Sequence, residues 1–213
     1  CTTAELLARA GVGKISLIDP DRIEMSNLQR QIAYTPADIG FYKAETLAQR
    51  LRAINPHIQV DSYTVRLDAT NATTLIAQQD LVLDGCDNFT TRYIVNEVCL
   101  KFAVPLISAS AIGFQGQLFM VEGKSACYAC LFPKDQHANE SLSCTDTGVL
   151  ATTPNVMASL QAHHALIYLG LGCTALQQKL LLWNGLTMQQ RILSFEKDPD
   201  CVLCQASHTA KAD

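Results

Sequence analysis

Long apolar runs, an excess of basic charge and internal repeats are all absent from this sequence of 213 residues. No stretch approaches the ~20 consecutive apolar residues that a membrane-spanning helix needs, and residues 1–5 do not have the pattern of a signal peptide. The formal net charge of -4 provides no basic field for nucleic acid, and the charges are scattered rather than grouped. We therefore expect a cytoplasmic protein that binds neither membranes nor nucleic acid.

The composition favours one folded domain with a substantial core. Hydrophobic residues make up 48% of the chain, and a chain of this length buries one core well. We assign residues 1–205 to a single domain and residues 206–213 to a flexible tail.

Short apolar strands alternate with helical stretches along most of this domain. We expect strands at 14–19, 58–63, 81–84 and 104–110, an edge strand at 117–122 and a hairpin of 180–183 with 190–195. We expect helices at 2–10, 42–54, 71–79 and through Leu100, and a strongly amphipathic helix at 156–169. This order predicts an α/β fold with a doubly wound, mostly parallel, Rossmann-like sheet and an antiparallel C-terminal part.

The strand at 14–19 ends in Asp19, which the fold would place at the carboxyl edge of the sheet. Open α/β sheets bind ligands at this edge, so the carboxylate of Asp19 is a candidate acceptor for ribose hydroxyl groups. In dinucleotide-binding units a glycine-rich phosphate loop precedes the first helix. Because a helix already begins near Cys1, we expect the first strand and its glycine loop to lie upstream of Cys1.

Polar side chains that can handle phosphate follow Asp19. Arg30 and Lys43 supply positive charge, and the amides Asn27 and Gln29 lie close to Arg30 in sequence. Asp87 lies just beyond the strand at 81–84, where a carboxylate can hold Mg²⁺ between phosphates. Taken one at a time, such residues are more often surface charges, turns or helix caps.

Nine cysteines are a high density for a protein of this kind. Four of them form the Cys-x-x-Cys pairs Cys127/Cys130 and Cys201/Cys204, which in a reducing compartment are typical of metal ligands. Four thiolates with no open position predict a structural zinc site. The alternative is four ordinary buried or redox cysteines. The other five are Cys1, Cys86, Cys99, Cys144 and Cys173, and most of these should be small core residues.

Several of these motifs occur in an order that resembles the HesA/MoeB/ThiF family, the bacterial relatives of ubiquitin-activating enzymes. The similar segments are 26–31, Lys43 in its helix, 87–92, 108–118, 127–133, 143–149 and the terminal Cys-x-x-Cys. The resemblance implies that Asp19 holds the ribose of ATP, that Asn27, Gln29, Arg30 and Lys43 contact its phosphates, and that Asp87 holds Mg²⁺. Asn88, the neighbour of Asp87, is placed with the cofactor-binding residues.

The family resemblance also implies a reaction. Residues 1–205 would form an ATP-binding adenylation domain that activates the C-terminal glycine carboxylate of a ubiquitin-fold sulfur-carrier protein ending in Gly-Gly. A homodimer and a sulfur donor, either a sulfurtransferase or a cysteine desulfurase, complete the expectation. The segment Ser-Ala-Ser-Ala-Ile-Gly-Phe resembles thiamine-pathway members more closely, and the molybdopterin synthase small subunit is the second candidate carrier.

Cys144 is open to two interpretations. In thiamine-pathway members the corresponding cysteine is thought to link to the carrier's tail, so Cys144 is a candidate for covalent attachment. No cationic neighbour in sequence lowers its pKa, and the alternative is a cysteine with no part in the reaction.

Two other functions compete with adenylyl transfer. A NAD-dependent oxidoreductase would also use Asp19 for its ribose, but it does not account for Arg30, Lys43 and the paired cysteines together. A non-catalytic, zinc-containing module that binds the carrier's tail is the third hypothesis.

Overall fold

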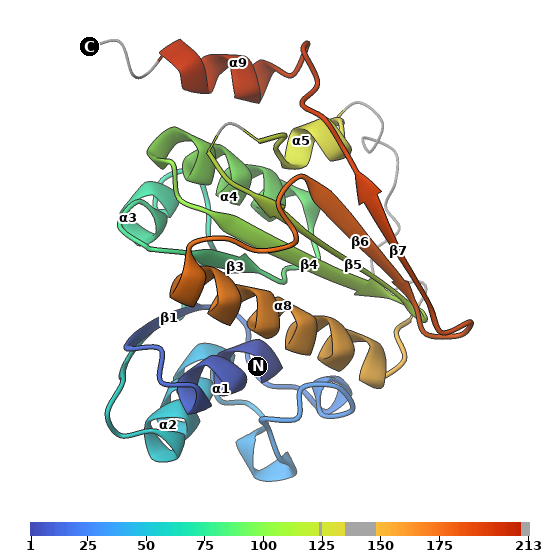
Figure 1. The fold of residues 1–213 in the computed structure, drawn as a ribbon. Helices are drawn as coiled ribbons and strands as arrows, with labels where there is room; N and C mark the ends of the chain where they lie inside the picture. The colour runs from blue at the N-terminus through green and yellow to red at the C-terminus, as the bar shows by residue number, and fades with distance from the viewer. Residues whose placement is uncertain (124, 135–147, 210–213) are drawn as a thin grey trace.

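The computed structural model describes residues 1–123, 125–134 and 148–209, with side chains described as far as Gln205. The strands form two sheets, and the helix α8 (Thr152–Leu171) lies between the larger sheet and the N-terminal elements (Figure 1). None of the helices in these ranges has both the length and the apolarity that a membrane crossing requires.

The smaller sheet contains two parallel strands near the N-terminus. Its elements, with the helices around them, are α1 (Thr2–Arg9), β1 (Lys14–Ile18), α2 (Lys43–Ile54) and β2 (Gln59–Tyr63). Ile15 is paired with Val60, and both are buried against Leu47 and Leu51 of α2. Gly11 has φ +85°, a left-handed conformation that glycine adopts without strain, so the chain can leave α1 and turn into β1.

The larger sheet has the strand order β3-β4-β5-β6-β7. The strands are β3 (Val82–Asp84), β4 (Leu106–Ile112), β5 (Gln115–Val121), β6 (Lys179–Asn184) and β7 (Gln189–Ser194). Only β3 and β4 are parallel, and the other three pairs are antiparallel. The sheet is therefore mixed, and the predicted antiparallel C-terminal part is confirmed. That part makes up three of the four strand pairs, so this sheet is not mostly parallel as expected. Short turns reverse the chain between β4 and β5 and between β6 and β7, where parallel strands would need crossovers.

Side chains of the larger sheet alternate between two hydrophobic clusters. Ile107 of β4 and Leu118 of β5 belong to the cluster that includes α8 and the N-terminal helices. Leu106 and Phe119, their neighbours in sequence, belong to the second cluster with α4 (Phe89–Phe102) and α5 (Tyr128–Leu131). Because successive strand residues point to opposite faces, both faces of β4 and β5 are covered.

Four expectations about single elements differ from the structure. The strand predicted at the edge is β5, and it lies inside the sheet between β4 and β6. The helix predicted to be amphipathic is α8, and it packs against α1 as well as against β4 and β5. The backbone of α9 (Val202–Thr209) is helical past Ala206, where a flexible tail was expected. The predicted helix at 71–79 is also shorter, since α3 spans Ala72–Ile76.

The predicted single sheet is divided in the described residues. No strand in these ranges joins β1 to β3, so one edge of each strand is unpaired within this part of the chain. Helix α8 connects the two halves through its contacts with α1, β4 and β5. The α/β class is confirmed, and the ends of β1 and β3 become the two places where a site can be built.

Candidate nucleotide site and metal centre

Asp19 lies directly after β1, where the sequence predicts a ribose site. Its backbone N–H donates to the carbonyl of Tyr63 (3.1 Å), and its carboxylate accepts a hydrogen bond from the N–H of Asp21 (2.9 Å). Burial raises the pKa of the Asp19 carboxyl above its ordinary value, although the Asp21 N–H and the Lys43 ammonium act in the opposite direction. The strand end thus presents an oriented, half-buried acceptor, which suits ribose hydroxyl groups.

Lys43, the first residue of α2, brings an ammonium group to the same strand end. Its Nζ lies 3.0 Å from Oδ2 of Asp21, and the Lys43 side chain is 11% exposed against 57% for Asp21. The backbone N–H of Lys43 also donates to the carbonyl of Asp21 (2.9 Å). A mostly buried cation is therefore held by a carboxylate that faces solvent, and an incoming phosphate can compete for it.

The segment between β1 and α2 carries the other predicted phosphate contacts. Asn27 is buried, and its Oδ1 accepts a hydrogen bond from the N–H of Glu24 (3.1 Å), which stabilises the 3-10 helix Met25–Asn27. Gln29 is exposed, and half-buried Arg30 donates from Nη1 to the carbonyl of Ser26 (3.1 Å). Asn27 thus shapes the segment, while Gln29 and Arg30 remain closer to its surface.

The end of β3 forms the second part of the site. Asp84 closes the strand, and its Oδ1 accepts a hydrogen bond from the N–H of Cys86 (2.9 Å). Asp87 follows and is exposed. Asn88 is the N-cap of α4, since its Oδ1 accepts a hydrogen bond from the N–H of Thr91 (2.8 Å). This loop therefore presents Asp87 as its exposed carboxylate.

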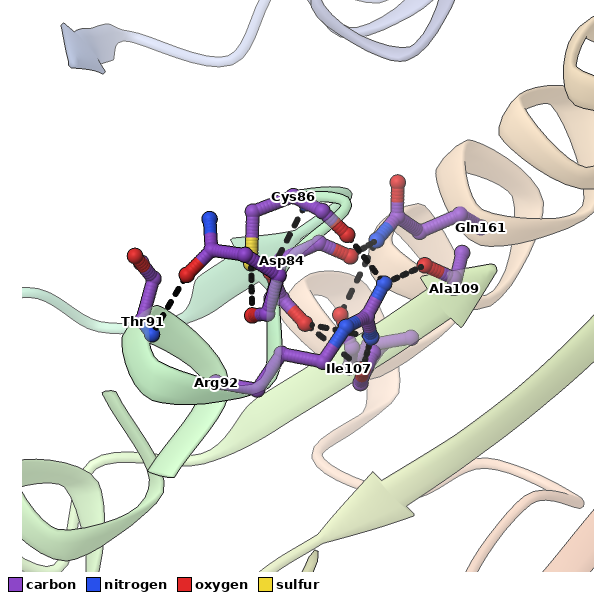
Figure 2. Close-up of polar contacts among 9 residues, drawn as sticks. Asp84, Cys86, Thr91, Arg92, Ile107, Ala109 and Gln161 are labelled. Atoms are coloured by element: carbon purple, nitrogen blue, oxygen red, sulfur yellow. Dashed lines mark hydrogen bonds and ion pairs between the residues drawn. The ribbon is translucent and has the colours of Figure 1, made fainter. Parts of the chain in front are cut away.

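Arg92 holds this loop against the sheet from inside, as Figure 2 shows. Its Nη1 donates to Oδ2 of Asp84 (2.8 Å) and to the hydroxyl of Ser108 (2.7 Å). Its Nη2 donates to the carbonyls of Cys86 and Ala109. The side chains of Arg92 and Asp84 are 8% and 5% exposed, so the pair is buried and each charge depends on the other.

The sequence alone predicts no site role for Arg92. A signal was available, because an arginine in the first turns of α4 follows an acid that ends a buried strand. A buried carboxylate needs a charged or hydrogen-bonding partner. Sequence alone does not show which carboxylate the arginine reaches.

The four paired cysteines come together where α5 and α9 contact α4. Their Sγ atoms all lie within 4.8 Å of one another. The distances are 3.8 Å for Cys127–Cys130, 3.7 Å for Cys127–Cys201 and 3.6 Å for Cys130–Cys204. Zinc–sulfur bonds of about 2.3 Å place tetrahedral ligands about 3.8 Å apart, so the four thiols fit a closed site of that kind.

The protonation state of the cysteines affects metal binding at such a site. Burial raises the pKa of Cys127 to about 11 and also raises that of Cys204. Burial acts in the same sense on Cys201, but hydrogen bonds from the Cys204 N–H and from neighbouring thiols lower its pKa overall. A metal ion would displace the protons of the raised thiols, because the thiolate is the ligand.

Comparison with known proteins decides the family. A model of the ThiF family matches residues 1–203. The chain belongs to the ThiF family. Sulfur carrier protein adenylyltransferase of Thermus thermophilus is 39% identical over 207 residues, which cover 94% of this chain and 76% of that protein. SAMP-activating enzyme E1 of Haloferax volcanii is 35% identical over 200 residues, covering 94% and 74%.

Solved structures with the same fold include E. coli MccB with ATP. Its TM-score to this ThiF-family chain is 0.83 at 25% identity, and the match covers 95% of this chain and 62% of that one. The chain therefore spans less than two thirds of the MccB chain. The match confirms the Rossmann-like α/β fold, and the relatives' names confirm the expected adenylyltransferase class.

The individual roles of the predicted site residues in this ThiF-family chain stay predictions. The structure brings Asp19 and Lys43 together at the end of β1 and places Asp87 in the loop after β3. It also gathers the four predicted metal ligands. Cys144 lies outside the described residues.

Proposed function

We propose that this protein transfers the adenylyl group of ATP to the C-terminal glycine carboxylate of a ubiquitin-like sulfur carrier ending in Gly-Gly. The observation that carries the proposal is the arrangement at the end of β1. There, the buried ammonium of Lys43 lies beside Asp21, and the oriented carboxylate of Asp19 adjoins them. Such a pairing of a cation for phosphate with an acceptor for ribose is what a nucleotide requires.

In the proposed reaction a carboxylate oxygen of the carrier forms a bond to the α-phosphorus of ATP. The bond from that phosphorus to the bridging oxygen breaks, and pyrophosphate leaves with the electron pair. Asp19 would orient the ribose, while Asn27, Gln29, Arg30 and Lys43 would hold the phosphates. The protein contributes positioning and positive charge rather than covalent chemistry.

Two metal ions belong to the proposal. The exposed carboxylate of Asp87 is an oxygen ligand of the kind that Mg²⁺ prefers, and bound Mg²⁺ would neutralise phosphate charge. The four clustered cysteines fit zinc in a structural role, with no position left open for substrate. The Asn88 side chain caps α4, so its contribution to nucleotide binding would be through the loop it fixes.

We propose a thiamine-pathway carrier as the first candidate, since residues 108–114 resemble members of that pathway most closely. The molybdopterin synthase small subunit is the second. Sulfide-level sulfur, supplied through a sulfurtransferase or a cysteine desulfurase, would then bond to the acyl carbon as AMP leaves, giving a thiocarboxylate. Cys144 is the candidate attachment point for the carrier. A homodimer agrees with the exposed apolar side chains of Met25, Ile32 and Phe41 beside the site.

Exchange of labelled pyrophosphate into ATP tests the proposal. We expect exchange that depends on a Gly-Gly-ended carrier, and each of Arg30→Ala and Asp87→Ala should lower it by about 100-fold or more. Running both candidate carriers side by side identifies the pathway. Exchange with neither carrier would contradict adenylyl transfer and favour the non-catalytic carrier-binding module.

A NAD-dependent oxidoreductase is the weaker alternative. It accounts for Asp19 but gives no role to Lys43 beside it or to Arg30. Binding of NAD in preference to ATP, measured by calorimetry on the same protein, would support that alternative instead.

A further inference from the structure

Two amide side chains of α8 reach the two separate parts of the candidate nucleotide site. Asn155 lies in the first turn of the helix and Gln161 lies six residues later. At about 1.5 Å per residue, the two are about 9 Å apart along the helix axis. Neither residue has a role in the proposed chemistry.

Asn155 holds the backbone of Arg30. Its Nδ2 donates to the carbonyl of Arg30 (3.0 Å) and to the carbonyl of Ala151, the N-cap of α8 (2.9 Å). Its Oδ1 accepts a hydrogen bond from the hydroxyl of Thr2, at the start of α1. The amide therefore ties three segments together at the point where the Arg30 side chain begins.

Gln161 makes the corresponding contacts at the end of β3 and near the start of β4, as Figure 2 shows. The side chain is 4% exposed, and its Nε2 donates to the carbonyls of Asp84 and Ile107, both at 2.9 Å. Its Oε1 accepts a hydrogen bond from the hydroxyl of Thr3 (3.0 Å). Gln161 therefore fixes the residue from which the loop to Asp87 departs.

The two sets of contacts follow one plan. In each, a threonine at the start of α1 donates to an amide of α8, and that amide donates to a backbone carbonyl of a site segment. Gln161 is buried and Asn155 is half-buried. Breaking the hydrogen bonds of such amides is costly, most of all for Gln161, so both side chains are held in place. Helix α8 thereby sets where Arg30 and the Asp84–Asp87 loop lie relative to each other.

We propose that Asn155 and Gln161 are positioning residues that hold the Arg30 segment and the Asp84–Asp87 loop at the separation that catalysis needs. The inference rests on the proposed adenylyl transfer. Neither side chain contacts substrate in this proposal, and each acts through the backbone it holds. Small displacements of catalytic groups cost large factors in rate, which makes the effect measurable.

A double-mutant cycle in the pyrophosphate-exchange assay tests the proposal. Asn155→Ala should lower kcat for carrier-dependent exchange about tenfold, because the Arg30 guanidinium loses its position. In an Arg30→Ala background the same change should cost less than about twofold, since no guanidinium is left to place. Ser159→Ala is the matched control, because the exposed hydroxyl of Ser159 donates to the backbone carbonyl of Asn155 within the helix and not to a site segment. It should leave exchange unchanged.

The equivalent cycle pairs Gln161→Leu with Asp87→Ala. Because Gln161 is buried, its replacement can destabilise the fold, so thermal unfolding is measured for every variant. If Gln161→Leu does not fold, the Asn155 cycle alone tests the proposal. Equal penalties for Asn155→Ala with and without Arg30 would overturn the inference while leaving adenylyl transfer intact. Absence of exchange in the unaltered protein would overturn the proposed function and the inference together.

Discussion

At the scale of single residues, Arg92–Asp84 is the most deeply buried ion pair among the described residues. Four hydrogen bonds from one guanidinium connect the end of β3, the following loop and β4. Taking both charges out of water is expensive, and the pair itself adds little net stability. Its effect is to make the loop before Asp87 depend on one side chain.

Removing one partner should be costly, because the other charge stays buried and uncompensated. We expect Arg92→Leu to lower the free energy of unfolding by about 3–5 kcal/mol, measured by urea denaturation. The exposed pair Arg9–Glu5 is the control, with side chains 58% and 28% exposed. Arg9→Leu should change the free energy by less than about 1 kcal/mol, and similar losses for both variants would show that the Asp84 environment is not as buried as described.

The sequence indicated candidate site residues only where the spacing of neighbouring residues already fixes their arrangement. The Cys-x-x-Cys pairs came together as expected because each pair is already preorganised over three residues. Asp19 could be proposed as a ribose acceptor because the strand before it ends there. No role could be proposed for Asn155 and Gln161 from the sequence. An amide on a helix has many possible partners, and only the packing of the folded chain brings these two to the carbonyls of Arg30 and Asp84.

At the scale of elements, α8 shows why periodicity alone misleads. A helix with water on one side is amphipathic, whereas α8 contacts α1 on one side and two strands on the other. The helix therefore needs apolar residues nearly all round, and its buried polar side chains, Thr153 and Gln161, bind carbonyls of β3, β4 and the turn after β4. A strand inside a sheet can likewise be mistaken for an edge strand, as happened with β5.

The C-terminal half of α8 should make the protein sensitive to mild acid. The Nδ1 atom of His164 lies 2.7 Å from the hydroxyl of Thr174, and burial, followed by the charge of His163, lowers the pKa of His164 below its ordinary value of 6.5. The unfolded chain therefore binds this proton more readily than the folded one. Stability from the neutral ring is complete above pH 6.5 and is lost as pH falls through the lowered pKa.

Replacing His164 by glutamine keeps a polar partner for Thr174 but removes the titration. The decrease in free energy of unfolding from pH 7 to pH 5, values that bracket the histidine range at about 6.5, should be smaller in His164→Gln than in the unaltered protein. His57→Gln changes an exposed histidine and should keep the full decrease. An unchanged pH dependence in His164→Gln would assign the acid sensitivity to other groups.

At the scale of the whole molecule, the described residues form two sheets joined by α8, and α5 and α9, which carry the cysteine cluster, lie at the end remote from β1 (Figure 1). The sequence order predicted the α/β class, and the described residues place its strands in these two sheets. The cluster joins residues 74 positions apart. It therefore connects α9 to the body of the protein formed by α4, α5 and the larger sheet.

Metal binding should control whether α9 stays attached. At a free zinc concentration 1,000-fold above the dissociation constant, a bound ion stabilises the folded state by about 4 kcal/mol. We expect about one zinc ion per chain by elemental analysis, as four thiolates complete one tetrahedral site, and its loss in a Cys201→Ser/Cys204→Ser variant. Because α9 contacts α4 next to the cluster, loss of the ion should expose residues 195–201 to protease faster than the rest of the chain.

Chelation of the unaltered protein gives the same test without mutation. It should reproduce the faster cleavage, and acidification should do so too, since protonated thiols do not bind zinc. Cys173→Ser alters an exposed cysteine outside the cluster and should retain both the ion and the protection. If protection survives complete removal of the metal, the packing of Tyr93, Tyr128 and Phe132 around the cysteines is sufficient to hold α9. The four thiols would then be core residues rather than metal ligands.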